Sequence, residues 1–133
     1  MPKKSDPILP RPTDSELAIL RLLWRLGPST VREVFNAVNE SRAEPLGYTT
    51  VLRFLQIMKE KGLVIRTEEA RGHVFAPAVP AERTKRQIVG DVMERVFGGS
   101  AKELVVQALG TGKISVEEVR EIRKMLNELD SEK

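Results

Sequence analysis

Residues 46–62 decide the fold, and they read Leu46-Gly-Tyr-Thr-Thr-Val-Leu-Arg-Phe-Leu-Gln-Ile-Met-Lys-Glu-Lys-Gly62. On a helical wheel Val51, Leu55 and Met58 share one face of this stretch. Gly62 suits the left-handed cap at which helices end. The spacing therefore predicts one amphipathic helix over this stretch, with its apolar face in the core of the domain.

The opposite face of this predicted helix carries Thr49, Thr50, Arg53, Gln56 and Ile57. In the major groove of DNA, Arg pairs with guanine, Gln pairs with adenine, and Thr or Ile methyl groups meet the thymine methyl. The pattern predicts a helix that reads base edges. An ordinary amphipathic helix with a mixed, solvated surface is the alternative.

Composition narrows the class of protein. The chain has 133 residues, 41% hydrophobic and 31% charged, as in a soluble globular protein. This length suffices for one compact domain or for a small domain plus an oligomerisation element. No apolar run approaches the roughly 20 residues that span a bilayer, and no secretory signal is apparent, so we expect a cytoplasmic protein without membrane insertion. The absence of cysteine excludes disulfides and thiolate metal sites. The net charge of +3 arises within residues 1–79, which modestly supports a nucleic-acid partner.

Two helices are predicted before residue 46. Residues 1–12 contain four prolines and are expected to form a flexible N-terminal arm, in which Lys3, Lys4 and Arg11 could touch phosphates or simply be solvated. The patterns Thr13-Asp14-Ser15-Glu16 and Thr30-Val31-Arg32-Glu33 are capping boxes, in which hydroxyl and carboxylate satisfy free backbone N–H groups. The first helix should end at residue 26, and the second should be short.

A β-hairpin is predicted after the helix at 46–62. Residues 63–67 and 73–76 are short β-rich runs, and residues 68–72 should form the tip between them. Three helices followed by a hairpin is the order of a winged helix-turn-helix domain, here residues 13–79. Arg66 and Arg71 are candidate phosphate contacts, although they could serve solubility alone. His73, the only histidine, cannot build a typical zinc site without a cysteine or a second histidine.

Residues 80–133 are predicted to form three helices that dimerise. Three amphipathic helices of this length would leave apolar faces exposed in a monomer, and a symmetric dimer would cover them. A self-contained three-helix cap is the alternative. The candidate dimerisation residues are the apolar positions at helical spacing: Ile88, Val92, Val96, Leu104, Val119, Ile122, Leu126 and Leu129.

Over residues 12–129 the chain resembles the BlaI/MecI penicillinase-repressor family of bacterial transcriptional repressors. The matching segments are Pro12-Thr13-Asp14-Ser15-Glu16-Leu17, Leu23-Trp24, Thr30-Val31-Arg32-Glu33-Val34, Tyr48-Thr49-Thr50-Val51-Leu52, Met58-Lys59-Glu60-Lys61-Gly62-Leu63-Val64 and Gly72-His73-Val74-Phe75. The resemblance implies a mainly α fold with a small β-hairpin, and a homodimer on a pseudo-palindromic operator. It also implies base or phosphate contacts by Thr49, Thr50 and Arg53, with Tyr48 at the start of the same helix.

The chain departs from the family at two places. Well-studied members are cleaved at an Asn-Phe bond after a membrane sensor-protease responds to a β-lactam, whereas the aligned positions here are Gln107-Ala108. This departure puts proteolytic release, and such a partner, in question. Copper-responsive relatives bind metal through C-terminal cysteines, and this chain has none.

Two rival functions have their own signatures. A winged-helix protein–protein interaction module would present an apolar surface in place of Thr49, Thr50 and Arg53. An enzyme would need a nucleophile with its base, or a phosphate loop; Gly110-Thr111-Gly112-Lys113 lacks the first glycine and the Ser/Thr of such a loop. We therefore expect no enzymatic activity, no cofactor and no metal.

Overall fold

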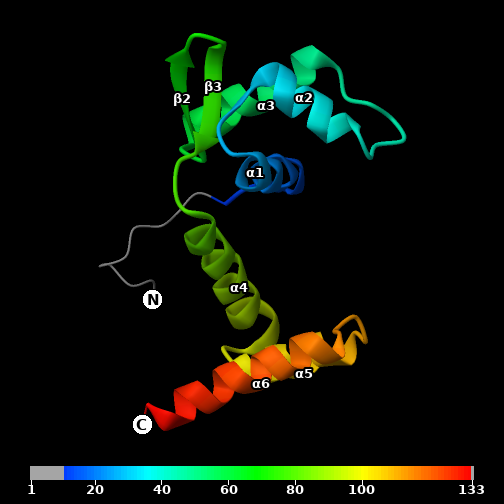
Figure 1. The fold of residues 1–133 in the computed structure, drawn as a ribbon, viewed down its shortest axis with the longest axis vertical. Helices are drawn as coiled ribbons and strands as arrows, with labels where there is room; N and C mark the ends of the chain where they lie inside the picture. Colours follow the sequence, from blue (N-terminus) through cyan, green and yellow to red (C-terminus); the bar gives the residue numbers. More distant parts are fainter. Residues whose placement is uncertain (1–10, 133) are drawn as a thin grey trace. The chain divides into compact units, whose positions relative to one another are not determined.

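The computed structural model of the protein describes residues 11–132. Of the predicted arm at residues 1–12, all but Arg11 and Pro12 lies outside the described residues. The elements follow in the order α1 (Asp14–Leu26), β1 (Ser29–Thr30), α2 (Val31–Asn39), α3 (Tyr48–Lys61), β2 (Val64–Glu69), β3 (Gly72–Pro77), α4 (Ala81–Phe97), α5 (Ala101–Gly110) and α6 (Val116–Ser131) (Figure 1). This order confirms the predicted winged helix-turn-helix followed by helices.

The chain divides into two compact units, Met1–Gln87 and Ile88–Lys133. The division falls inside α4, because the first turns of this helix pack on the first unit. Thr84 is buried there, and Lys85 Nζ lies 5.5 Å from the centroid of the Trp24 ring. None of the helices in the described part of the chain is long and apolar enough to cross a membrane.

Side-chain caps fix where most helices begin. Thr13 and Thr30 accept a hydrogen bond from the N–H of Glu16 and Glu33, and each glutamate accepts one from the backbone N–H of its threonine. These are the complete capping boxes that the sequence predicted. Ser100 and Ser115 cap α5 and α6 more simply: each hydroxyl accepts a hydrogen bond from the backbone N–H three residues later, and the glutamate at that position returns none.

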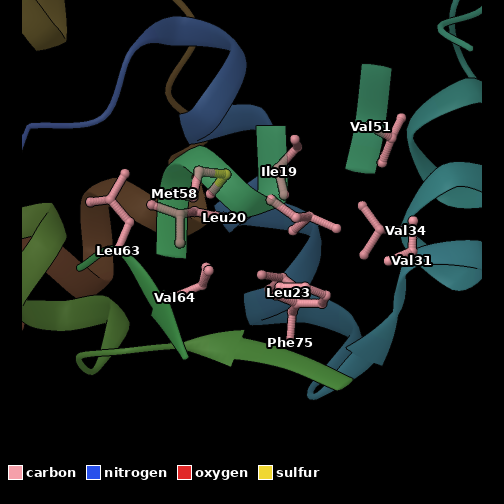
Figure 2. Close-up of a cluster of buried hydrophobic side chains, with 11 residues drawn as sticks. Ile19, Leu20, Leu23, Val31, Val34, Val51, Met58, Leu63, Val64 and Phe75 are labelled. Carbon is pink, nitrogen blue, oxygen red and sulfur yellow. The ribbon is translucent and has the colours of Figure 1, made fainter. Parts of the chain in front are cut away.

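The hydrophobic core lies entirely within the first unit (Figure 2). The three helices and the wing each contribute side chains that are almost completely shielded from solvent. The members are Ile19, Leu20 and Leu23 of α1, Val31 and Val34 of α2, Val51, Leu55 and Met58 of α3, and Leu63, Val64 and Phe75 around the wing. Truncation of one such large side chain to alanine typically costs about 2–5 kcal/mol of stability.

The wing is a three-stranded antiparallel sheet in the order β1-β3-β2. The sequence did not predict β1, because two residues are too few to show a periodic pattern. Ser29 pairs with Phe75, and Thr30 pairs with Val74. The hairpin tip is also tighter than predicted: β2 extends to Glu69 and pairs it with Gly72. Gly72 has a φ of 108°, which lets the chain reverse over two residues instead of five.

A buried carboxylate joins the start of α1 to the end of α3. Glu16 is 4% exposed, and its Oε1 accepts hydrogen bonds from Lys61 Nζ at 2.6 Å and from the Thr13 N–H at 2.9 Å. Burial alone would raise the pKa of Glu16, but the bonds from Lys61 and Thr13 outweigh it and hold that pKa below its ordinary value. The ionised form is therefore the one that the fold stabilises.

Glu16→Gln should lower the free energy of unfolding at pH 7, because it removes the negative charge that binds Lys61. The loss should be only about 1–2 kcal/mol, since Lys61 is partly solvated and the capping bond survives. A carboxylate with a depressed folded pKa stabilises the protein above its unfolded pKa and loses this effect as the pH falls through the folded value. The deficit of Glu16→Gln should therefore shrink as the pH falls below the ordinary glutamate pKa of 4.5 and through the lower folded value. Urea unfolding at pH 7 and pH 3 measures it. Glu60→Gln, the same change on the exposed face of α3, is the control, and an equal deficit of Glu16→Gln at both pH values would contradict the prediction.

Candidate nucleic-acid interface

Helix α3 turns one face into the core and presents the other to solvent. Val51, Leu55 and Met58 are fully buried. All five side chains predicted to face outward are exposed, namely Thr49, Thr50, Arg53, Gln56 and Ile57. Tyr48, at the first turn, is also exposed. The orientation is thus the one that the helical spacing predicted.

Both ends of α3 are held in place. At the C-terminal end Gly62 adopts the left-handed conformation, with φ 82° and ψ 17°, and its N–H bonds back to the Lys59 carbonyl. At the other end the loop from α2 is pinned by Asn39, whose amide donates to the Leu46 carbonyl at 3.0 Å and accepts the Leu46 N–H at 2.8 Å. The sequence did not predict this role of Asn39.

No side chain in the part of the chain that the structure describes caps the N-terminus of α3. Its N-cap residue is Gly47, which has no side chain to accept the free backbone N–H groups of the first turn. The positive end of the helix dipole lies at the same place. Free N–H groups and this dipole together favour an anion at the start of the helix.

A cleft of about 450 Å³ lies between α3, the start of α2 and the wing. Four of the predicted contact residues line it, namely Tyr48, Gln56, Arg66 and Arg71. The remaining lining residues are Thr30, Val31, Arg32, Leu52, Gly72, His73 and Phe75. Thr49, Thr50, Arg53 and Ile57 are not part of the lining and occupy the exposed face of α3.

Arg32 in this cleft is a candidate that sequence analysis missed. Its guanidinium lies over the Tyr48 ring, 4.6 Å from the centroid, and 5.3 Å from the centroid of Phe35. The two rings meet edge to face at 5.6 Å. This stacking fixes the guanidinium beside the first turn of α3 while leaving its N–H groups without a carboxylate among residues 11–132. The sequence shows Arg32 only as part of a capping box.

The two wing arginines have different surroundings. Arg66 on β2 is exposed and has no ion-pair partner within the described residues. Arg71, at the tip, contacts the carboxylates of Glu33 and Glu69 at 2.9 Å and 3.4 Å. Of the two, Arg66 therefore presents the free charge. His73 Nε2 lies 3.1 Å from Glu68 Oε1 and belongs to the surface of the wing.

The second unit has no buried residue between positions 88 and 132. Four of the candidate dimerisation residues are half-buried: Ile88, Leu104, Val119 and Ile122. The other four are exposed: Val92, Val96, Leu126 and Leu129. Six more large apolar side chains are exposed in this unit, namely Val89, Val105, Val106, Leu109, Val116 and Met125. The unit thus lacks a core of its own.

Comparison with known proteins gives a consistent result. The family model for the penicillinase repressor matches residues 12–128. The transcriptional regulator BlaI of Mycobacterium tuberculosis is 28% identical over 124 residues, which is 92% of this chain and 88% of that protein. The penicillinase repressor of Bacillus licheniformis is 22% identical over 120 residues, 90% of this chain and 92% of that protein. The structure of a MarR family protein from Bacillus stearothermophilus shares the fold, with a TM-score of 0.50 and 23% identity over 96% of this chain and 76% of the other.

Proposed function

The chain belongs to the penicillinase repressor family, a family of transcriptional regulators and not of enzymes, and on this premise we propose how it acts. It represses transcription as a homodimer that binds a pseudo-palindromic operator and blocks the promoter. In each subunit α3 enters the major groove and the wing follows the DNA backbone. The observation that carries the proposal is the exposed strip of α3, held outward by its buried opposite face.

Base reading is assigned to the exposed strip. Arg53 has no ion-pair partner among residues 11–132, so its fork of donors is available for a guanine. Gln56 projects from the next turn and suits an adenine. The methyl groups of Thr49, Thr50 and Ile57 suit thymine methyls. A surface of this kind fits base edges better than it fits an apolar protein partner.

Backbone contact is assigned to the cleft and the start of α3. Arg32 and Arg66 line the cleft from α2 and β2, and neither has an ion-pair partner in the described part of the chain. The uncapped N-terminus of α3 adds free N–H groups nearby. A DNA strand in the cleft would place phosphates against these groups, which would fix the register of α3 in the groove.

Dimerisation is assigned to the second unit. Its exposed apolar side chains lie on α4, α5 and α6, and none of residues 88–132 is buried. An unpaired apolar surface of this kind is typical of an interface between subunits. A symmetric pair would hold two copies of α3 in successive major grooves, about 34–36 Å apart. Operator DNA as the partner also agrees with the expected cytoplasmic location.

The family resemblance raises release by a membrane sensor-protease, which the residues at the aligned bond put in question. The bond that aligns with the cleavage site of studied members joins Gln107 and Ala108, and both residues are exposed within α5. Cleavage there would require the end of α5 to unwind first. The residues at the bond differ from Asn-Phe, so the same protease specificity would not apply.

The proposed function predicts that the purified protein selects a pseudo-palindromic duplex from a random pool at low ionic strength. Affinity for this duplex should fall steeply with salt, since cations released from phosphates drive the binding. Arg32 and Arg66 of two subunits give four phosphate contacts, which corresponds to a slope of roughly −4 in log affinity against log salt concentration, or steeper. Fluorescence anisotropy measures the slope. Failure to enrich any duplex would overturn the function.

Arg53→Ala should weaken binding to the selected duplex by about 1–3 kcal/mol per half-site and relax the preference at one base pair. The reason is that a bidentate contact from Arg discriminates guanine from the other bases. Competition with duplexes substituted at each position identifies that base pair. An equal loss of affinity for every duplex, whatever its sequence, would show that Arg53 contacts phosphate instead.

Replacing both Ile122 and Leu126 by Asp should produce a monomer and lower operator affinity, because two charges would then lie in the apolar interface. Sedimentation equilibrium at micromolar concentration measures the oligomeric state. Lys124→Asp, which changes charge on the opposite face of α6, is the matched control and should remain dimeric. A monomeric unmutated protein at this concentration would remove the dimer from the proposal.

A further inference from the structure

We propose that Arg71 is a positioning residue, which ties the tip of the wing to the start of α2, and that it does not bind DNA phosphate. From the sequence, Arg71 and Arg66 are both candidate phosphate contacts, but the contacts of the Arg71 side chain indicate a different role. The inference rests on the proposed function, because the position of the wing matters only if the cleft receives DNA.

Arg71 makes hydrogen bonds to three separate segments. Its Nη1 donates to both carboxylate oxygens of Glu33 on α2, at 2.9 Å and 3.2 Å. Its Nη2 donates to the backbone carbonyl of Pro28 at 3.0 Å, and its Nε donates to Glu69 on β2 at 3.4 Å. The guanidinium carries its donors on three separate nitrogens and so reaches all three groups at once, whereas a lysine ammonium carries its donors on one nitrogen.

Glu33 links this network to the backbone. Its Oε1 accepts the N–H of Thr30 at 2.8 Å as well as Arg71 Nη1. The bond from Thr30 and the charge of Arg71 hold the pKa of Glu33 below its ordinary value, so the carboxylate is ionised at neutral pH. Thr30 in turn pairs with Val74 of β3. A closed circuit of bonds thus runs from β3 through β1 and Glu33 to Arg71 and back to the wing.

The circuit matters because the sheet alone does not hold the tip. Strand β1 pairs with β3 at Val74 and Phe75 and extends no further. From His73 to the tip, β3 pairs with β2 alone. This end of the wing is therefore a two-stranded ribbon, and such ribbons twist and bend easily. Arg71 supplies a tether at the far end of the ribbon. Since Arg71, Gly72 and Thr30 line the cleft, this tether sets the width of the cleft that would receive a DNA strand.

The charge of Arg71 is already neutralised, which argues against a phosphate contact. Carboxylates of Glu33 and Glu69 lie within 3.4 Å of its guanidinium, whereas Arg66 has no such partner among the described residues. A phosphate at Arg71 would have to displace these carboxylates and would meet their negative charge. Phosphate binding is therefore favoured at Arg66 and disfavoured at Arg71.

The tether can be cut without unfolding the protein. The side chains of Arg71 and Glu33 are 45% and 48% exposed, and exposed ion pairs contribute little to stability. In Glu33→Gln the amide oxygen can still accept the Thr30 N–H, so the cap of α2 survives while the charge is lost. Glu68→Gln is a matched control. It also removes one negative charge, but it affects only the contact between Glu68 and His73, which lies within the wing.

The test measures binding of Glu33→Gln, Arg71→Ala, Arg71→Lys, Arg66→Ala and Glu68→Gln to the duplex that the unmutated protein selects from a random pool. Glu33→Gln should weaken binding roughly three- to tenfold, although loss of a negative charge would by itself strengthen binding to DNA. Arg71→Ala should weaken it to a similar degree. Arg71→Lys should not restore it, because an ammonium keeps the charge and loses the fork. Glu68→Gln should bind at least as tightly as the unmutated protein.

Salt dependence separates the two arginines. Arg66→Ala should make the salt slope shallower by the amount that corresponds to one lost phosphate contact per subunit. Arg71→Ala should change the slope less than Arg66→Ala does. In the free protein, amide hydrogen exchange at the tip should be faster in Glu33→Gln and Arg71→Ala than in Glu68→Gln.

Three results would overturn the inference while leaving the proposed function intact: Glu33→Gln binding as tightly as Glu68→Gln, Arg71→Lys binding like the unmutated protein, or Arg71→Ala changing the salt slope as much as Arg66→Ala. If the unmutated protein selects no duplex, the proposed function fails and this inference fails with it.

Discussion

The joint burial of Val51, Leu55 and Met58 is the constraint on which the rest of the molecule depends. All three are fully buried, so α3 can lie on the core in only one rotation about its axis. A helix that has to bury one face presents the opposite face, and here the presented face is mostly polar and carries Arg53, which has no ion-pair partner among residues 11–132. The same rotation sets the position of Tyr48, on which Arg32 stacks. The proposed reading surface is thus a consequence of packing, and a mutation in the core would change it without touching any of its residues.

Charge on this side of the molecule is divided between cations that are committed to the fold and cations that are free. Lys61 is bound to Glu16, and Arg71 is bound to Glu33 and Glu69. Arg32, Arg53 and Arg66 have no carboxylate partner within residues 11–132. Only free cations add to the attraction for a polyanion, since a paired cation must first lose its carboxylate. The net charge of the chain therefore says less about DNA binding than the identity of the unpaired arginines does.

Local patterns in the sequence were sufficient for most of the fold. The capping boxes at Thr13 and Thr30 act over three residues, and the stripe of α3 repeats within one helix, so both are legible without any tertiary information. The features that could not be predicted are non-local. Strand β1 exists because Ser29 and Thr30 meet β3, and no pattern within two residues records this. Arg71 binds Glu33, which is 38 residues away in the sequence, and Arg32 stacks on the ring of Tyr48, which lies on a different helix. Spacing correctly put Arg66 and Arg71 on one hairpin but could not show that only Arg71 has a partner from another element.

The second unit raises a question of folding as much as of assembly. Isolated helices of 10–17 residues are marginal in water, and a packed core normally supplies what they lack. Residues 88–132 contain no buried side chain, so this unit cannot obtain that stabilisation from its own packing. In the proposed dimer the second copy would provide the missing core, and folding of α5 and α6 would then be coupled to association. Such coupling would make operator occupancy depend on protein concentration through both dimer formation and DNA binding. It would also make any event that loosens α5 or α6 act on repression at a distance from the DNA.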